Sequence, residues 1–116
     1  MKYRRFEDLP VWKDSADLAR RMFEFTIVEE LRRHPGLRDQ LERAALSVSN
    51  NIAEGFERGS TRELLAFLYI ARGSAGEVRS MLKVLAGWSN VANLRFQISL
   101  TNRKTSRDNY TAGLRV

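Results

Sequence analysis

The sequence predicts an all-α protein, an up-and-down four-helix bundle that forms one domain over residues 1–116. Three observations predict this fold. Apolar residues recur every three to four positions over most of the chain, which is the period of an amphipathic helix. The interruptions of this period fall at proline, glycine and serine, which begin or end helices. The length of 116 residues and the hydrophobic share of 43% fit one globular domain.

The first helix is predicted over about residues 9–31. Asp8 before Leu9 and Pro10 is typical of a helix start, because an aspartate side chain caps free amides and proline is tolerated in the first turn. Its main stripe consists of Val11, Ser15, Leu18, Met22 and Phe25. The helix pattern then breaks at His34-Pro35-Gly36.

The second helix is predicted over about residues 37–56. Its apolar stripe is continuous and consists of Leu37, Leu41, Ala44, Ala45, Val48 and Ile52. The third helix is predicted over about residues 60–86, because the segment from Ser60 to Glu63 matches a capping box. Its core stripe consists of Leu64, Phe67, Leu68, Ala71, Ala75, Val78, Leu82 and Leu85.

The third helix carries a second apolar strip on its far side, which predicts a second packing partner. This strip is the candidate oligomer interface, and it consists of Ala66, Ile70, Met81 and Val84. A fourth helix is predicted over about residues 91–112, on a weaker stripe. The alternation over residues 96–101 is typical of a strand and the stretch 101–109 is polar, so a frayed segment is the alternative there.

The net charge of +6 is concentrated near the end of the chain, where residues 87–116 hold five basic side chains and one acidic one. These five are the candidates for binding nucleic acid: Arg95, Arg103, Lys104, Arg107 and Arg115. Ordinary solubilising charge is the alternative explanation. The absence of cysteine excludes disulfides and thiolate sites and favours the cytoplasm. Neither a signal peptide nor an apolar run long enough for a membrane span is recognisable, so no membrane association is expected.

No catalytic site is recognisable, and we expect no enzyme, cofactor, metal site or small-molecule substrate. The single histidine, His34, falls in a predicted turn, remote in sequence from a plausible nucleophile. A di-metal bundle would need Glu-x-x-His motifs, which one histidine in a turn cannot supply. Glycine-rich loops of the type that hold phosphates are also lacking, and Gly73 and Gly76 are better explained by close helix packing.

A band of polar residues borders the apolar stripes of the second and third helices. It consists of Gln40, Ser47, Asn51, Glu54, Arg58, Ser74 and Glu77. Spacings of three and four place such side chains within reach of each other. We expect a hydrogen-bond network that fixes the register of the two helices. The alternative is a small pocket in which Glu54 or Glu77 acts as an acid or base.

The segment of residues 40–58, which reads QLERAALSVSNNIAEGFER, resembles the signature of the four-helix-bundle family encoded in intervening sequences of bacterial 23S rRNA genes. Matches outside the segment include Phe6, Asp8, Leu9, Val11, Trp12, Thr26, Gly36, Leu37, Glu63, Phe67, Leu68, Ala71, Gly73, Ser74 and Glu77. Glu29-Glu30 replace the family's Phe-Pro, which predicts a longer first helix, and Ser49 replaces a proline. Beyond Asn90 the similarity is faint.

The resemblance implies an up-and-down bundle that assembles into a homo-oligomer, pentameric in relatives, without an established enzymatic activity. It also implies a relation to accessory proteins of diversity-generating retroelements, which are thought to bind nucleic acid and a reverse transcriptase. Two hypotheses follow: a non-enzymatic oligomeric scaffold, and an RNA-binding accessory protein that uses a basic surface. The third, kept for contrast, is an enzyme that uses Glu54 and Glu77.

Overall fold

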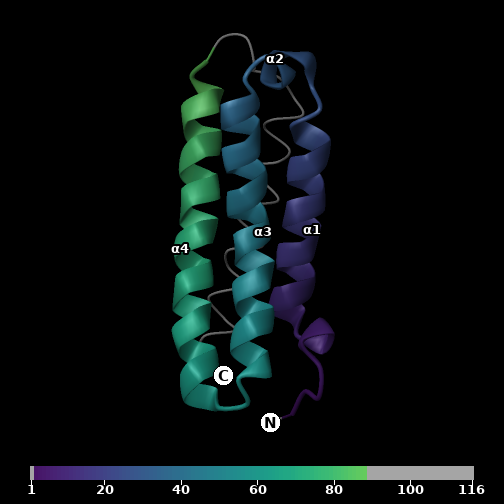
Figure 1. Ribbon diagram of the computed structural model, residues 1–116, viewed down its shortest axis with the longest axis vertical. Coiled ribbons are helices and arrows are strands. Elements are labelled where there is room, and N and C mark those ends of the chain that lie inside the picture. Colours follow the sequence, from purple (N-terminus) through teal and green to yellow (C-terminus); the bar gives the residue numbers. More distant parts are fainter. Residues whose placement is uncertain (1, 89–116) are drawn as a thin grey trace.

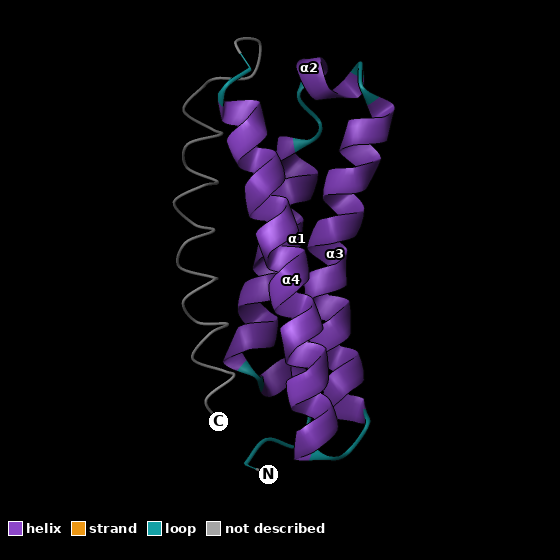
Figure 2. Ribbon diagram, turned by 90° about the vertical axis from the view of Figure 1, so that its left-hand side faces the viewer, coloured by secondary structure: helices purple, strands orange, loops and turns teal. Residues whose placement is uncertain are grey.

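The computed structural model describes residues 2–88, and this part of the chain is helical without a strand (Figures 1 and 2). A short 3-10 helix, η1 (Phe6–Asp8), precedes α1 (Pro10–Phe25), α2 (Glu29–Arg32), α3 (Pro35–Glu57) and α4 (Thr61–Ala86). The all-α class is therefore confirmed. The predicted fourth helix, residues 91–112, lies outside the described residues, and the four-helix up-and-down topology stays a prediction.

The three long helices lie side by side, with α3 between α1 and α4 (Figure 1). Following the chain, α1 runs away from the N-terminal end of the molecule, α3 returns and α4 runs parallel to α1. Helix α3 packs on both neighbours, whereas the Cα atoms of α1 and α4 stay more than 8 Å apart. Side chains of α1 and α4 nevertheless belong to the same buried clusters as side chains of α3. None of the helices within residues 2–88 is long and apolar enough to cross a membrane.

The core has two clusters, one toward each end of the three helices. The cluster near α2 contains Leu18, Ala19, Met22, Phe25, Leu31, Leu41, Ala44, Ala45, Val78, Leu82 and Leu85. The cluster near η1 contains Leu9, Val11, Val48, Ile52, Leu64, Leu68, Ala71 and Ala75. Two serines are also buried, and each donates a hydrogen bond to a carbonyl three residues earlier, Ser15 to Trp12 and Ser49 to Leu46. These bonds satisfy the buried hydroxyls.

The prediction that the first helix continues to Leu31 is wrong, because α1 ends at Phe25. Three consecutive β-branched residues, Thr26, Ile27 and Val28, follow, and such residues lose side-chain freedom in a helix. The Thr26 side chain is fully buried, and its hydroxyl lies 2.6 Å from Glu42 Oε2 on α3 and 3.2 Å from the Phe23 carbonyl oxygen. Val28 is extended, with ψ at 147°. The chain thus turns at Thr26 before it forms α2.

The other helix ends are close to their predicted positions. Helix α3 begins at Pro35, two residues before the predicted start. The predicted cap of α1 by Asp8 does not form, because Asp8 lies within η1. The residue directly before α1 is Leu9, and no side chain caps this helix. The predicted cap of α4 forms, because Ser60 Oγ accepts a hydrogen bond from the Glu63 backbone amide at 3.2 Å.

Candidate functional site

The polar band forms a short hydrogen-bonded link between α3 and α4. Ser47 Oγ lies 2.9 Å from Ser74 Oγ, and either hydroxyl can donate. Asn51 Nδ2 donates to Ser47 Oγ at 3.0 Å and to the Ser47 carbonyl oxygen at 2.7 Å. All three side chains are half-buried. Such a satisfied network fixes the register of two helices and offers no free nucleophile or base.

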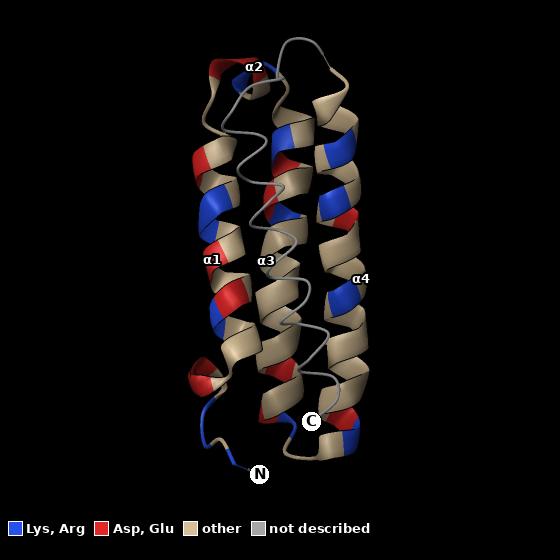
Figure 3. Cartoon of the chain, turned by 180° about the vertical axis from the view of Figure 1, so that it is seen from behind, with Lys and Arg blue, Asp and Glu red and all other residues tan. Residues whose placement is uncertain are grey.

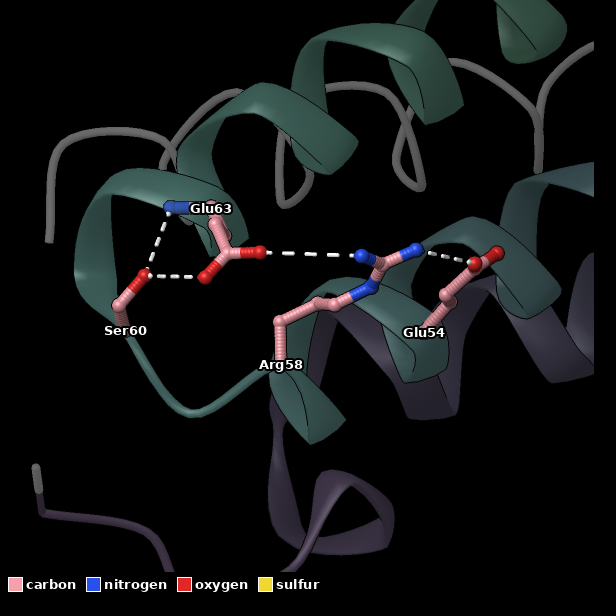
Figure 4. Close-up of polar contacts among 4 residues, drawn as sticks. All are labelled: Glu54, Arg58, Ser60 and Glu63. Carbon is pink, nitrogen blue, oxygen red and sulfur yellow. Dashed lines mark hydrogen bonds and ion pairs between the residues drawn. The ribbon is translucent and has the colours of Figure 1, made fainter.

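A second polar cluster joins the end of α3 to the start of α4 (Figure 4). Arg58 Nη2 lies 3.1 Å from Glu54 Oε1, and Arg58 Nη1 lies 3.8 Å from Glu63 Oε2. Glu63 Oε1 in turn accepts a hydrogen bond from Ser60 Oγ at 3.0 Å. The Arg58 guanidinium also lies 5.1 Å from the centre of the Phe67 ring. The signature residues Glu54 and Arg58 therefore hold the α3–α4 turn.

Gly55 allows α3 and α4 to approach closely beside this turn. A Cβ atom on Gly55 would lie 2.5 Å from Phe67 Cβ and 3.3 Å from the Leu64 Cα. Gly59 supplies the turn itself, because its φ of 84° belongs to the left-handed region that favours glycine. Gly55 within the signature and Gly59 directly after it thus allow a tight helical hairpin.

Two members of the predicted polar band stay outside these clusters. Gln40 and Glu77 are exposed, and neither makes a hydrogen bond or an ion pair with another residue of the described part. A shallow pocket on α3 includes Arg43, Ser47, Asn50 and Glu54, but not Glu77. The structure therefore does not bring Glu54 and Glu77 together, although an enzyme that uses both would need them in one cleft.

The second apolar strip of α4 lies largely in solvent. Ile70 is 53% exposed, Val84 is 72% exposed, and Ala66 is exposed as well. Met81 differs, because it is half-buried and packs against the core cluster near α2. We call Ala66, Ile70 and Val84 the outer strip. Ala66 and Val84 are about five helical turns apart and so lie on one line along α4.

The basic side chains of α3 and α4 differ in their partners. Both basic residues of α3 pair with a carboxylate four residues away, as Arg38–Glu42 and Arg43–Asp39, and Arg58, directly after the helix, pairs with Glu54. The basic residues of α4 make no ion pair within residues 2–88, and they are Arg62, Arg72, Arg79 and Lys83. Figure 3 shows acidic and basic segments together on α1 and α3, whereas basic segments predominate along α4.

Three of these cations border a groove along α4 that reaches down to the buried Ala75, and we call it the basic groove. Its described lining comes from α4 alone and includes Tyr69, Arg72, Gly73, Gly76, Arg79 and Lys83. The predicted nucleic-acid residues, Arg95 to Arg115, lie outside the described residues. Sequence reasoning overlooked the α4 cations, although a signal exists: none of them has Asp or Glu three or four positions away.

No curated protein is similar enough to the chain to count as a match. The family model described as 23S rRNA-intervening sequence protein matches residues 7–102, which is more than half of the chain. The matched range contains the helical hairpin of α3 and α4, with the Ser47–Ser74 link and the Glu54–Arg58 pair. The chain therefore belongs to the family of 23S rRNA-intervening sequence proteins.

Proposed function

We propose that this protein is a non-enzymatic interaction module that assembles with copies of itself through the outer strip of α4. The observation that carries this proposal is the exposure of Ile70 and Val84, 53% and 72%, on one side of α4. Fully burying such a side chain contributes about 1.5–3 kcal/mol relative to leaving it exposed. Two copies that bury both residues gain several such contributions. We propose that the assembly forms in the cytoplasm, because the chain contains no cysteine and the cytoplasm is reducing.

The surroundings of the outer strip suit a partner of defined geometry. On the α3 side the strip is bordered by Ser74, which is held by Ser47, and on the other side by the basic groove. A central apolar strip with a polar border is the usual arrangement of an interface between subunits. The resemblance to the family implies a homo-oligomer, with five subunits in relatives, which supports a second copy of this chain as the occupant.

The test is the molar mass in solution, measured by light scattering over a range of protein concentrations. We expect a mass above that of the monomer, and we expect the combined change Ile70→Glu with Val84→Glu to yield the monomer. Ile27→Glu is the matched control, because Ile27 is 54% exposed but lies in the turn after α1. A monomer at every concentration of the unchanged protein would contradict the proposal, as would equal effects of the two sets of changes.

A second candidate function is binding of RNA through a basic surface, and one observation favours it. The four cations of α4 lack carboxylate partners within residues 2–88 and can therefore contact a phosphate backbone; they are Arg62, Arg72, Arg79 and Lys83. Phosphate contacts release counterions, and the affinity for RNA should therefore fall steeply as salt is raised. Absence of binding at low ionic strength, or binding that does not respond to salt, would contradict this candidate.

A further inference from the structure

We infer that the basic groove of α4 binds a single-stranded nucleic acid, with phosphates on Arg72, Arg79 and Lys83 and a base stacked on Tyr69. This inference rests on the second candidate function and names its site and its ligand class. It moves the site from the basic end of the chain to a helix face within the described part.

The charge of the groove calls for an anionic partner with several charges in a row. Arg72 and Arg79 are about 10 Å apart along the axis of α4, and Lys83 follows about 6 Å further on. Every residue three or four positions from these cations is uncharged or basic, so α4 itself cannot neutralise them. Glu77, the acidic residue nearest in the sequence, makes no ion pair with them. A row of cations at these spacings matches a chain of phosphates better than one small anion.

The floor of the groove is open to a close approach. A Cβ atom on Gly73 or Gly76 would meet nothing within 4 Å, so packing within the described part does not require either glycine. Glycine within a helix lowers its stability relative to alanine. Two glycines on the outward side of α4 leave its backbone bare between the cations, where a sugar-phosphate backbone can reach it.

Tyr69 favours a single strand over a duplex or an acidic peptide. Its side chain is 62% exposed and lies at the N-terminal end of the groove. An exposed aromatic ring beside cations stacks on an unpaired base, and this combination recurs in sites for single strands. The bases of a duplex are stacked on each other and present only their edges. An acidic peptide would use the cations but would gain no base stacking from Tyr69.

The experiment measures fluorescence anisotropy of a labelled oligouridine RNA with the full chain over a series of salt concentrations. Parallel probes are oligothymidine DNA, the duplex of the RNA with oligoadenosine, and a polyglutamate peptide. We expect both single strands to bind more tightly than the duplex and the peptide. Arg72→Gln or Arg79→Gln should each lower the slope of log affinity against log salt by about 1. Arg43→Gln on α3 is the control for charge, because Arg43 is paired with Asp39.

Two further variants separate binding from folding. Tyr69→Ala should weaken binding of the single strands about tenfold, and Tyr69→Phe should restore it, because the ring stacks and the hydroxyl does not. Gly76→Ala should raise Tm and still weaken binding, a combination that partial unfolding cannot produce. Gly36→Ala is its control, since a Cβ there also meets nothing within 4 Å but lies on α3.

The outcomes distinguish the site from the function. If no nucleic acid binds at low salt, both the second candidate function and this inference are overturned. If RNA binds but the α4 variants bind as well as the unchanged protein, the candidate function stands and this site is wrong. Equal or tighter binding of the duplex or of polyglutamate would overturn the assignment of a single-stranded ligand.

Discussion

The two longest helices of the described part, α3 and α4, use their outward side chains in opposite ways. On α3, the cations Arg38 and Arg43 are paired with carboxylates of the same helix. On α4, the cations are unpaired within residues 2–88, and apolar side chains as large as Ile70 and Val84 face solvent. Helix α3 lies between two neighbours and pairs both of its cations, whereas the cations of α4 have no carboxylate partner within residues 2–88. This difference supports the proposal that partners of this protein bind α4.

The largest expected effect on stability comes from replacing the glycine at which α3 and α4 approach each other. Gly55→Ala should lower the free energy of unfolding by about 2 kcal/mol, because the new Cβ overlaps Phe67 Cβ and the α3–α4 pair must separate. Urea denaturation measures this change. An unchanged midpoint would show that the close approach of the two helices at Gly55 is not needed.

The turn after α1 provides the next largest effect. Thr26→Val removes the hydroxyl that donates to Glu42 at 2.6 Å, and the free energy of unfolding should fall by about 1.5 kcal/mol. Arg38→Gln removes the more exposed partner of Glu42, at 3.3 Å, and should cost about 0.5 kcal/mol or less. If Arg38→Gln proves to be the more harmful change, the turn is not held by Thr26.

The Ser47–Ser74 link should show coupling between α3 and α4. A double-mutant cycle of Ser47→Ala and Ser74→Ala should give an interaction energy of about 1 kcal/mol, because the first change already breaks the bond. Ser80→Ala on the exposed side of α4 is the control and should change stability by about 0.5 kcal/mol or less. Additive effects of the two serine changes would mean that the Ser47–Ser74 hydrogen bond does not stabilise the packing of α3 on α4.

Alanine on the outward side of α4 should have the smallest effect and the opposite sign. Gly73→Ala should raise the free energy of unfolding by about 0.5–1 kcal/mol, because the helix gains stability and the methyl group meets nothing within 4 Å. Urea denaturation under the same conditions as for Gly55→Ala measures this change. Destabilisation of the monomer would indicate that Gly73 is packed after all.

Much of this fold is predictable from local chemistry. The capping box at Ser60 places the start of α4 to within a residue, and proline at the start of α3 brackets that helix. The early end of α1 was not predictable in this way, because it depends on a tertiary contact. Thr26 donates a hydrogen bond to Glu42, which is distant in the sequence. The run of β-branched residues at 26–28 was a local signal for the end of the helix. The first helix ends there even though Glu29-Glu30 replace the family's helix-breaking Phe-Pro.

The site was less predictable than the fold. Spacing placed Ser47 and Asn51 together, but the contact of Ser47 with Ser74 depends on how α3 and α4 are packed. Gln40 satisfied the same spacing rule and yet lies exposed. Periodicity predicts which side of the helix a residue lies on, but it does not predict how deeply the side chain is buried. The unpaired cations of α4 were visible as a lack of nearby carboxylates. Net charge concealed them, because residues 34–86 together hold seven basic and six acidic side chains and so look balanced.

The most direct test of the central claim uses single cysteines, because the native chain has none. Ile70→Cys on α4 and Ile27→Cys in the turn after α1 replace side chains of nearly equal exposure, 53% and 54%. The measurement is the rate of thiol labelling by a maleimide at high and at low protein concentration. We expect the thiol at position 70 to react much more slowly than the thiol at position 27 at high protein concentration, and we expect the two rates to converge on dilution. Equal rates at high concentration would contradict it.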